Sequence, residues 1–450
     1  MEGHGYKRIV YAIIESVLYG EREKPIQKVL RRMLRRYGLQ GSIHDPKISG
    51  IVYNIFRNLG LIDRIIYSAT GFDVSELNPI ERSILRALTY MLHVDERGAS
   101  REFLRKMKRY AIRYAEEKMN AIQTDRVKTL INRIALSEWK PRSFDEKIMV
   151  EYRISPKLYN VLAKALGELR EDIDRFLKFT LTPPPHVFRV NSLKASRENI
   201  IELLRSKGVS VEAGKYSPQA IRITGSLKRD VIELVEKGVL VPQDESSMVA
   251  IELLNPKEGM DIADLCAAPG GKTTYLAEKT RLKARINSFE IFEDRARRLK
   301  KLLKKTNTDS VVKVYVMDAR YADKVLGRES MDQVVIDPPC SSTGALARNP
   351  DVRWRYDEDE LERINRLQKE LLETGWKILK PGGRLLYTTC SVLPSEGEYV
   401  IKDFVKKHDD TTIIDLNKPF KKSPIFPQTM RAWPHIHNVT GFFYAILEKK

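Results

Sequence analysis

Residues 264–273 read Asp-Leu-Cys-Ala-Ala-Pro-Gly-Gly-Lys-Thr, directly after an apolar run typical of a strand and at the start of a helical pattern. Small residues in such a turn let the backbone approach a ligand, and the N-terminus of the following helix favours negative charge. Gly271-Lys272-Thr273 copies the end of the phosphate-binding pattern G-x-x-x-x-G-K-[ST], but Cys266 stands where that pattern has its first glycine. The alternative is a turn that binds a nucleoside cofactor in a doubly wound α/β sheet. This interpretation does not require a glycine at the position of Cys266.

The nucleoside interpretation requires an acidic residue at the end of the next strand, about 20 residues on, to bond the ribose hydroxyls. Glu290 closes the apolar run 286–290 and stands 20 positions after Gly270. Two later runs also end on a carboxylate, at Asp318 and Asp337. One such carboxylate could merely cap a helix, but three at consecutive strand ends beside a glycine turn predict a ligand pocket.

The rest of the C-terminal half alternates between strand and helix patterns. This alternation predicts a mostly parallel sheet covered on both faces, with ligands at the carboxyl ends of its strands. We therefore expect a Rossmann-like α/β domain over residues 241–450. The expected strands are 262–265, 286–289, 312–316, 334–336 and 385–388, and the expected helices are 272–280, 293–305 and 361–379.

Two further domains are expected upstream. Residues 1–140 show apolar residues at helical spacing, and Asp45-Pro46 and Asn78-Pro79 have the form of an N-cap followed by a first-turn proline, so this segment is predicted to be all-α. Residues 141–240 contain the strand-like run 186–190 and a helical pattern that ends at Gly208, which predicts a small α/β module. The fold class is thus multidomain.

Charge and composition narrow the class of protein. The formal net charge is +19, divided into +10 over residues 1–140, +5 over 141–240 and +4 over 241–450. A basic first segment is expected if it holds a polyanion, although a surface rich in salt bridges is the alternative. The same two interpretations, phosphate contact or solvated helix face, apply to two basic stripes: Arg31, Arg32, Arg35 and Arg36, and Lys106, Lys108, Arg109 and Arg113.

The cellular setting follows from what the composition excludes. No apolar run reaches the roughly 18 residues that a membrane span requires, and three widely separated cysteines cannot form a disulfide framework. The cysteines and histidines show no zinc spacing, so no metal is expected. We expect a cytoplasmic protein without a membrane partner, and a monomer.

Cys340 and Cys390 each follow a predicted strand, in Asp337-Pro338-Pro339-Cys340 and in Thr389-Cys390. Taken singly, each would more often be a small buried apolar residue, but neighbouring strand ends would bring both thiols to one crevice. A thiolate can add to carbon 6 of a pyrimidine and make carbon 5 electron-rich. Asp337 could bond the ring nitrogen, and a second cysteine could act when the first is expelled.

With these residues the sequence resembles the RNA (cytosine-5)-methyltransferases of the RsmB/Sun and NSUN family, which use S-adenosylmethionine. The resemblance extends over about 260 residues and preserves the order of the family's motifs. Its motifs are 264–273, Asp-Pro-Pro-Cys-Ser-Ser-Thr-Gly at 337–344, Asn-Pro-Asp-Val-Arg-Trp at 349–354, Thr-Thr-Cys-Ser-Val-Leu-Pro at 388–394, Trp-Pro-His at 433–435 and Gly-Phe-Phe at 441–443. Phe-Arg-Val-Asn at 188–191 and Gln-Asp-Glu-Ser-Ser at 243–247 also match.

The resemblance implies that Cys390 attacks carbon 6 and that Cys340 assists proton removal and product release. It implies that the S-adenosylmethionine and base sites are lined by Cys266, Ala267, Ala268, Pro269, Gly270, Gly271, Lys272, Glu290, Asp318 and Asp337, with Arg295 beside them. Residues 1–140 are similar to a NusB-like RNA-binding domain, notably at 52–57, and residues 145–240 to the family's RNA-recognition-like module.

Two positions depart from the family's pattern. Glu290 stands where bacterial RsmB-like members carry aspartate, which preserves the chemistry but changes the reach of the carboxylate. After Pro394 the family commonly has Glu-Glu-Asn, whereas this chain has Ser-Glu-Gly-Glu at 395–398. Neither departure touches the thiols.

Other functions account for fewer of these residues. An amino-group methyltransferase needs no thiol, and a P-loop ATPase leaves both cysteines unexplained. A non-catalytic RNA-binding or ribosome-assembly factor accounts for the charge but predicts no turnover. Within the resemblance, the RsmB branch implies small-subunit ribosomal RNA as substrate, and transfer RNA stays open.

Overall fold

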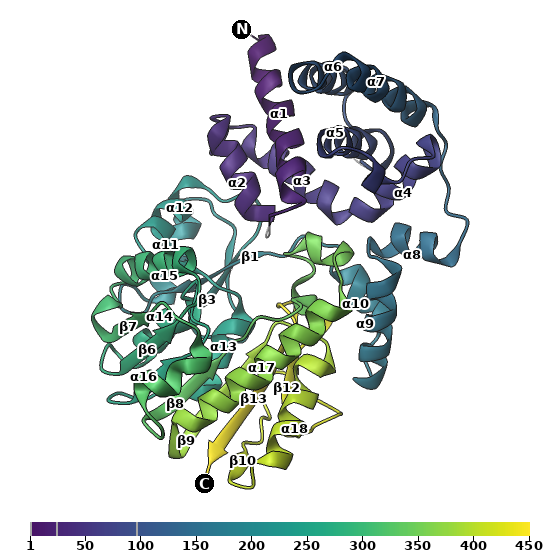
Figure 1. Ribbon diagram of the computed structural model, residues 1–450. Coiled ribbons are helices and arrows are strands. Elements are labelled where there is room, and N and C mark those ends of the chain that lie inside the picture. The colour runs from purple at the N-terminus through teal and green to yellow at the C-terminus, as the bar shows by residue number, and fades with distance from the viewer. Residues whose placement is uncertain (1, 24–25, 96–97) are drawn as a thin grey trace. The chain divides into compact units, whose positions relative to one another are not determined.

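The computed structural model describes residues 2–23, 26–95 and 98–450 (Figure 1). The chain divides into two compact units. The first, called the helical unit, comprises Met1–Val161 and Asn349–Tyr356, and the second, called the α/β unit, comprises Leu162–Arg348 and Asp357–Lys450. Among the described residues, no helix has the length and apolar character that crossing a membrane would require.

The helical unit is all-α, as the spacing of apolar residues predicts. Its helices are α1 (Glu2–Gly20), α2 (Ile26–Arg36), α3 (Asp45–Arg57), α4 (Leu59–Thr70), α5 (Pro79–Thr89), α6 (Arg101–Lys118), α7 (Ala121–Leu136) and α8 (Phe144–Tyr152), and a π-turn at Tyr90–Val94 follows α5. α9 (Pro156–Glu168) begins in this unit and ends in the other. The apolar residues of α1, such as Ile13 and Val17, are fully buried in its core.

The two proline signals mark helix starts with different accuracy. Asn78 caps α5, and its side chain accepts hydrogen bonds from the N–H groups of Ile80 and Glu81. α3 begins one residue earlier than predicted, because His44 occupies the cap position and Asp45 is already helical. The Asp45 carboxylate instead binds Arg31, at 3.0 Å.

A segment from the second half of the chain completes the helical unit. Residues Asn349–Tyr356, called the strap, contain a 3-10 turn at Pro350–Trp354 and pack among the helices. Trp354 Nε1 donates a hydrogen bond to the carbonyl of Arg57 at 2.9 Å, and a side chain on Gly60 would overlap the Trp354 ring. Eight residues separate Cys340 from the strap in the sequence.

The α/β unit begins with helices and a four-stranded antiparallel sheet, here called the module. The sheet has the order β2-β3-β1-β4, and β1 (His186–Val190) matches the predicted strand. Its apolar core contains Phe188, Val190 and Leu204, which confirms the small α/β module. The other elements are α10 (Ile173–Phe179), α11 (Arg197–Ser206), β2 (Val211–Ala213), β3 (Ala220–Ile223), α12 (Arg229–Glu236) and β4 (Leu240–Pro242).

The larger sheet has the order β11-β12-β13-β9-β8-β5-β6-β7, with β10 paired to β13. Its central strands β9, β8, β5, β6 and β7 are parallel, as predicted, whereas β13 runs antiparallel to β9 and was not expected. The strands are β5 (Asp261–Asp264), β6 (Arg285–Phe289), β7 (Val312–Tyr315), β8 (Met331–Ile336), β9 (Leu379–Thr389), β10 (Thr411–Ile413), β11 (Lys421–Lys422), β12 (Met430–Ala432) and β13 (Phe442–Lys449).

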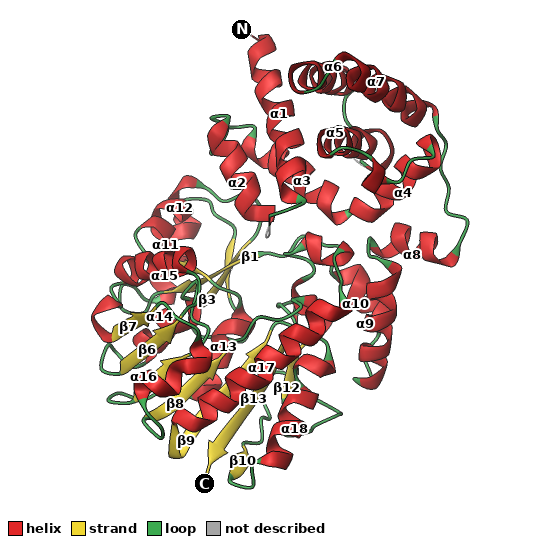
Figure 2. Cartoon of the chain, viewed as in Figure 1, coloured by secondary structure: helices red, strands yellow, loops and turns green. Residues whose placement is uncertain are grey.

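Helices cover both faces of this sheet (Figure 2). Met248 and Tyr275 pack with Val335 on one face, and Leu372 and Ile401 pack in the cluster of Val334 on the other. Adjacent residues of β8 therefore point into opposite cores, which is why the parallel strands are apolar throughout. The helices are α13 (Glu245–Leu254), α14 (Gly271–Lys279), α15 (Glu293–Thr306), α16 (Ala322–Leu326), α17 (Glu358–Ile378), α18 (Glu398–Lys407) and α19 (Pro434–His437).

Candidate active site at the carboxyl ends of the parallel strands

The glycine turn connects β5 to α14 and is held by a buried carboxylate. Asp264 accepts hydrogen bonds from Thr273 Oγ1 at 2.7 Å and from the N–H of Cys266 at 3.3 Å. Burial raises the pKa of Asp264 to about 6. Gly270 has φ of 111°, and a Cβ there would lie 2.7 Å from the Leu299 side chain. The turn therefore requires glycine both for its backbone and for its packing.

Glu290 and Arg295 close the turn from the side of β6. The buried Glu290 accepts a hydrogen bond from the N–H of Phe292 at 3.0 Å, and Arg295 Nε lies 3.3 Å from its second carboxylate oxygen. Arg295 Nη2 donates to the carbonyl of Ala268 at 2.8 Å. Arg295 thus joins the acidic residue to the turn, which brings together two parts of the site that the sequence placed separately.

The other two strand-end carboxylates have cationic partners. Asp318 caps a 3-10 turn at Ala319–Tyr321 and lies 2.7 Å from Arg320 Nη2, and its hydrogen bonds to Arg320 hold its pKa below the usual range. Lys272 Nζ lies 2.5 Å from Asp337 Oδ2. Lys272 is the second residue of α14 and Asp337 directly follows β8, so this pair links the glycine turn to the loop that carries Cys340.

The two thiols meet at neighbouring strand ends. β8 and β9 pair in parallel with Ile336 opposite Tyr387, so the segments that follow them leave the same edge of the sheet. The sulfur atoms of Cys340 and Cys390 lie 3.2 Å apart, and both residues are partly exposed. The N–H of Gly344 donates to the carbonyl of Cys390 at 3.0 Å, which joins the two loops through their backbones.

The environment makes Cys390 the more acidic of the two thiols. The hydrogen bond from the Cys340 thiol lowers the pKa of Cys390, with Ser342 and Lys272 acting in the same direction. The same pairing, together with burial, raises the pKa of Cys340 well above its ordinary value. Since the thiolate is the nucleophile, this asymmetry favours Cys390 for attack.

We therefore expect the alkylation of Cys390 by iodoacetamide to reach half its maximal rate below the roughly pH 8.5 of a free thiol. In Cys340→Ala the midpoint should move to higher pH, because the donor that stabilises the thiolate is gone. Mass spectrometry of the Cys390 peptide measures the rate. Cys266 is the internal control, since burial raises its pKa and its midpoint should lie above that of Cys390 in both proteins. An unchanged Cys390 midpoint in the variant would contradict this account.

Glu396 is a site residue that the sequence interpretation did not single out. Its buried carboxylate accepts hydrogen bonds from the N–H of Ser341 at 2.8 Å, from Ser341 Oγ at 2.5 Å and from Gln368 Nε2 at 3.2 Å. Glu398 is also buried and pairs with Arg431, which donates to the carbonyl of Ser391 at 2.9 Å. The segment 395–398 therefore supports the residues next to both cysteines. The sequence signal for this supporting role is the position of Glu396 and Glu398 between two largely apolar runs, 392–394 and 399–401.

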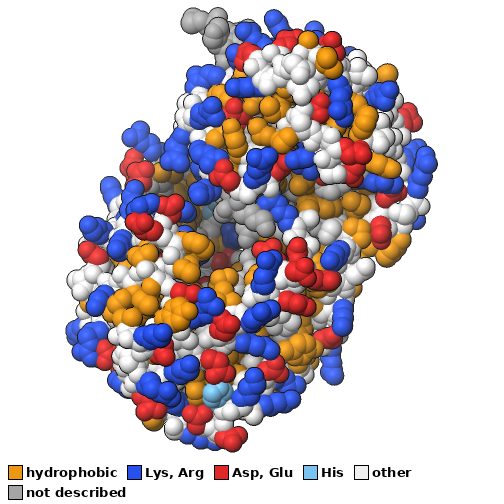
Figure 3. Space-filling model, viewed as in Figure 1, with side chains coloured by type: hydrophobic (Ala, Val, Ile, Leu, Met, Phe, Trp, Pro, Cys, Tyr) orange, Lys and Arg blue, Asp and Glu red, His pale blue; other side chains and the backbone are white. Residues whose placement is uncertain are grey.

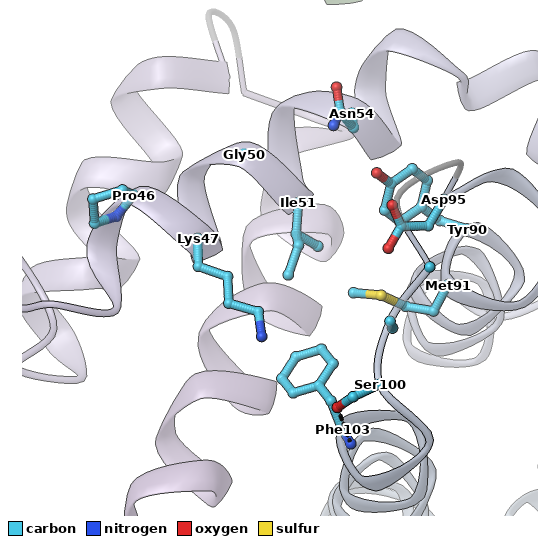
Figure 4. Close-up of a pocket in the computed structure, with 12 residues that line it drawn as sticks. Pro46, Lys47, Gly50, Ile51, Asn54, Tyr90, Met91, Asp95, Ser100 and Phe103 are labelled. Carbon is cyan, nitrogen blue, oxygen red and sulfur yellow. Dashed lines mark hydrogen bonds between the residues drawn. The ribbon is translucent and has the colours of Figure 1, made fainter. Parts of the chain in front are cut away.

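The cavity in Figure 4 lies in the helical unit and contains none of the predicted site residues. Its volume is about 340 Å³, and it is lined by parts of α3, the π-turn and the start of α6. Lys47 Nζ lies 4.1 Å from the centre of the Phe103 ring, so its charge is already engaged by a cation–π contact. The candidate chemistry thus belongs to the strand ends of the α/β unit.

Two family models match the α/β unit. The model described as 16S rRNA methyltransferase RsmB/F matches residues 251–448, and the ferredoxin-like domain of the RsmF/B-like methyltransferases matches residues 158–230. Ribosomal RNA small subunit methyltransferase B of Photorhabdus laumondii is 36% identical over 269 residues, 59% of this chain and 60% of the relative. The protein of that name from Yersinia enterocolitica is 33% identical over 267 residues, again 59% and 60%. The chain spans about 60% of the length of these curated relatives.

Solved structures extend the likeness to the whole chain. The crystal structure of PH0851 has a TM-score of 0.91 and 33% identity, covering 98% of this chain and 99% of that one. A methyltransferase homolog from Pyrococcus horikoshii has a TM-score of 0.57 and 27% identity, covering 66% of this chain and all of that one. NSun6 from Pyrococcus horikoshii, at 22% identity and a TM-score of 0.59, shares the fold. With the glycine turn and both cysteine loops inside the matched region, residues 158–448 of the chain belong to the RsmB/F methyltransferase family.

Proposed function

We propose that the protein transfers a methyl group from S-adenosylmethionine to carbon 5 of a cytosine in RNA, through a covalent bond between Cys390 and carbon 6. The observation that carries this proposal is the separation of 3.2 Å between the Cys340 and Cys390 sulfurs, beside the glycine turn. Neither an amino-group methyltransferase nor an ATPase has a use for that pair. The proposed substrate is ribosomal RNA, in line with the names of the curated relatives.

The residues at the strand ends fit S-adenosylmethionine. Glu290 directly follows β6, the strand after the glycine turn and α14. In this fold an acidic residue at that position accepts hydrogen bonds from the ribose hydroxyls. Ala267 and Ala268 are small, and the first N–H groups of α14 have no partners inside their own helix, so the turn suits the polar methionine end of the cofactor. When bound, the cofactor supplies an electrophilic methyl group. Together with Glu290, Asp318 and Asp337 place three carboxylates at the carboxyl ends of the parallel strands.

The chain's own residues then divide the remaining work. The Cys390 thiolate bonds to carbon 6, and the electron pair of the 5,6 double bond becomes available at carbon 5 for methylation. Asp337, held by Lys272, hydrogen-bonds the ring nitrogen and stabilises the adduct. We assign Cys340 to the last step, because its sulfur is the nearest neighbour of the departing one. Once Cys390 is bonded to carbon 6 it no longer carries the charge that holds the proton on Cys340, so the Cys340 thiol releases that proton to solvent. The Cys340 thiolate then takes the proton from carbon 5, the double bond is restored and the Cys390 thiolate leaves.

The direct test combines the full-length protein with S-adenosylmethionine carrying a tritiated methyl group and with deproteinised small-subunit ribosomal RNA, large-subunit RNA or transfer RNA. We expect label in small-subunit RNA and a new protected cytosine by bisulfite sequencing. Label confined to transfer RNA would retain the reaction and overturn the substrate. Label on an exocyclic nitrogen, or cofactor binding without turnover on any RNA, would overturn the proposed reaction.

The helical unit offers one of its two basic stripes for RNA. On α2, Arg31, Arg32 and Arg36 each pair with a carboxylate, so most of that stripe's charge is already compensated. On α6, Lys106 and Arg113 of the predicted stripe pair with Glu102 and Glu117. Arg109 and its neighbour Arg105, which the predicted stripe did not include, are exposed, lie one turn apart and form no ion pair among the described residues. Figure 3 shows basic side chains separated by acidic ones on the visible face, so local pairing decides which charges are available. We propose α6 as the RNA-contacting stripe.

Replacing Arg105 and Arg109 with glutamine should weaken RNA binding and lower the slope of log Kd against log salt by about 1.5, the value for two lost phosphate contacts. The matched control is Arg32→Gln/Arg36→Gln on α2, which removes the same charge from compensated positions. Filter binding between 50 and 300 mM salt measures both slopes. Equal slopes for the two double variants would show that the α6 stripe is only a solvated face.

A further inference from the structure

Arg189 is a fully buried arginine on β1 of the module that reaches across to α14. Its Nη2 and Nε atoms bind the Glu278 carboxylate at 2.6 and 3.1 Å, a two-point ion pair. Two further contacts reach the start of α14: Nη1 donates to the carbonyl of Gly271 at 2.7 Å, and Nη2 donates to Thr274 Oγ1 at 2.8 Å. Nη1 also donates to the side-chain oxygen of Gln243, which precedes α13. Arg189 therefore contacts both ends of the helix that follows the glycine turn.

These contacts fix the backbone of the cofactor turn. Thr274 Oγ1 in turn donates to the carbonyl of Gly270 at 2.8 Å, so Arg189 acts on two successive carbonyls, one directly and one through the threonine. Because a peptide unit is planar, holding the Gly270 and Gly271 carbonyls also sets the direction of the N–H groups of Gly271 and Lys272. These N–H groups belong to the first turn of α14, where no helical partner exists and a ligand can bind.

We propose that Arg189 is a positioning residue for S-adenosylmethionine, through which the module shapes the cofactor site of the methyltransferase sheet. The inference rests on the proposed function only in the identity of the cofactor. A buried ion pair gives little net stability, because desolvation of the two charges offsets their attraction. The planar fork of arginine is suited to holding a carboxylate and a carbonyl at once, which the single ammonium of lysine cannot do in the same geometry.

A second buried pair in the same module provides a matched control. Arg222 on β3 pairs with Glu245 on α13, and both side chains are as deeply buried as Arg189 and Glu278. Glu245 also accepts the N–H of Tyr216 at 2.7 Å, so this pair joins the module to the sheet as well. Neither partner has a hydrogen bond to the residues of the glycine turn in the described structure. Arg189 and Arg222 are therefore equally buried, but only Arg189 has a hydrogen bond to the glycine turn.

The experiment measures the Kd of S-adenosylmethionine by calorimetry in the full-length protein without RNA, beside Tm and the Kd of ribosomal RNA. We expect Arg189→Lys to raise the cofactor Kd at least tenfold and to leave the RNA Kd within twofold. Arg189→Lys and Arg222→Lys should lower Tm by similar amounts. Arg222→Lys, however, should leave the cofactor Kd within twofold of the wild-type value. Thr274→Val, which keeps shape and loses the hydroxyl, should raise the cofactor Kd about threefold with little change in Tm.

Equal cofactor Kd values for Arg189→Lys and Arg222→Lys would overturn the proposal and leave Arg189 as a structural ion pair. If Arg189→Lys does not fold, Thr274→Val carries the test, and an unchanged cofactor Kd in that variant overturns the proposal. The readout also separates this inference from the proposed function. Cofactor binding without RNA methylation would refute the reaction alone, whereas absence of cofactor binding in the wild-type protein would refute both.

Discussion

Cys390→Ala should abolish methyl transfer, whereas Cys340→Ala should accumulate a covalent complex between protein and RNA. Both substitutions remove one sulfur from the same pair, yet they act on different steps. Without Cys390 no bond to carbon 6 forms, so we expect kcat to fall by at least about 10⁴, as when a nucleophile is removed from other covalent enzymes. Without Cys340 the bond forms and the methyl group transfers, but release slows and the adduct persists.

The measurement is a denaturing gel with labelled RNA, run beside the tritium assay. Cys340→Ala should show a slowly migrating band that depends on S-adenosylmethionine and disappears in the Cys340→Ala/Cys390→Ala double variant. Cys266→Ala controls for the loss of a thiol outside the pair. Because Cys266 lies in the glycine turn, this variant is assayed at saturating S-adenosylmethionine, where no slow band should accumulate. A band that survives in the double variant, or full activity in Cys390→Ala, would refute the assignment of the two roles.

Gly344→Ala should separate the two cysteine loops. The N–H of Gly344 binds the carbonyl of Cys390 at 3.0 Å, and the N–H of Gly441 binds the carbonyl of Gly344 at 2.9 Å. A Cβ at Gly344 would overlap the carbonyl oxygen of Gly441 and lie 2.9 Å from that of Cys390, both of which are backbone atoms. Since backbone on both sides cannot move like a flexible side chain, one loop must shift.

We expect Gly344→Ala to lower kcat about 100-fold, because displacing a reacting group by about 1 Å has an effect of that size. Overpacking should also reduce the free energy of unfolding by about 1–3 kcal/mol. The cofactor Kd should stay within threefold, since the turn 264–272 lies on another loop. Steady-state kinetics, calorimetry and chemical denaturation measure these three quantities.

Gly167→Ala is the control for this substitution. Gly167 lies in the part of α9 that belongs to the α/β unit, and a Cβ there meets no atom within 4 Å. Alanine at this helical position should stabilise the protein by about 0.5–1 kcal/mol and leave kcat unchanged. Gly344→Ala with kcat within threefold of the wild type would show that the contact between the two loops does not position the thiols.

Much of the site could be predicted because its signals are local. The glycine turn, Glu290, Asp337 and both cysteines follow apolar strand patterns, and parallel strands bring such residues to one edge of a sheet whatever the details of packing. The helical unit was predictable for a similar reason, since the 3.6-residue spacing of apolar side chains indicates helices without any knowledge of their partners. α3 begins one residue before the predicted start, because the Asp45 carboxylate pairs with Arg31 instead of capping the helix.

Contacts between distant segments could not be predicted from those signals. The strap has the composition of a loop, and only packing shows that Trp354 belongs to the core of the helical unit. In the sequence, Arg189 is one basic residue in a predicted strand. Only the structure shows that it binds the Gly271 carbonyl and the Glu278 carboxylate. Glu396 likewise gains its role from Ser341, 55 positions earlier in the chain.

The sequence by itself therefore determined the fold class, the glycine turn and the two candidate thiols, because periodicity and residue chemistry act over a few neighbouring positions. Only the tertiary structure decided which thiol is the more acidic, what holds the cysteine loops together and how the module reaches the glycine turn. The physical reason is that burial, hydrogen-bond geometry and steric fit depend on atoms brought together from distant parts of the chain, and no local pattern records them.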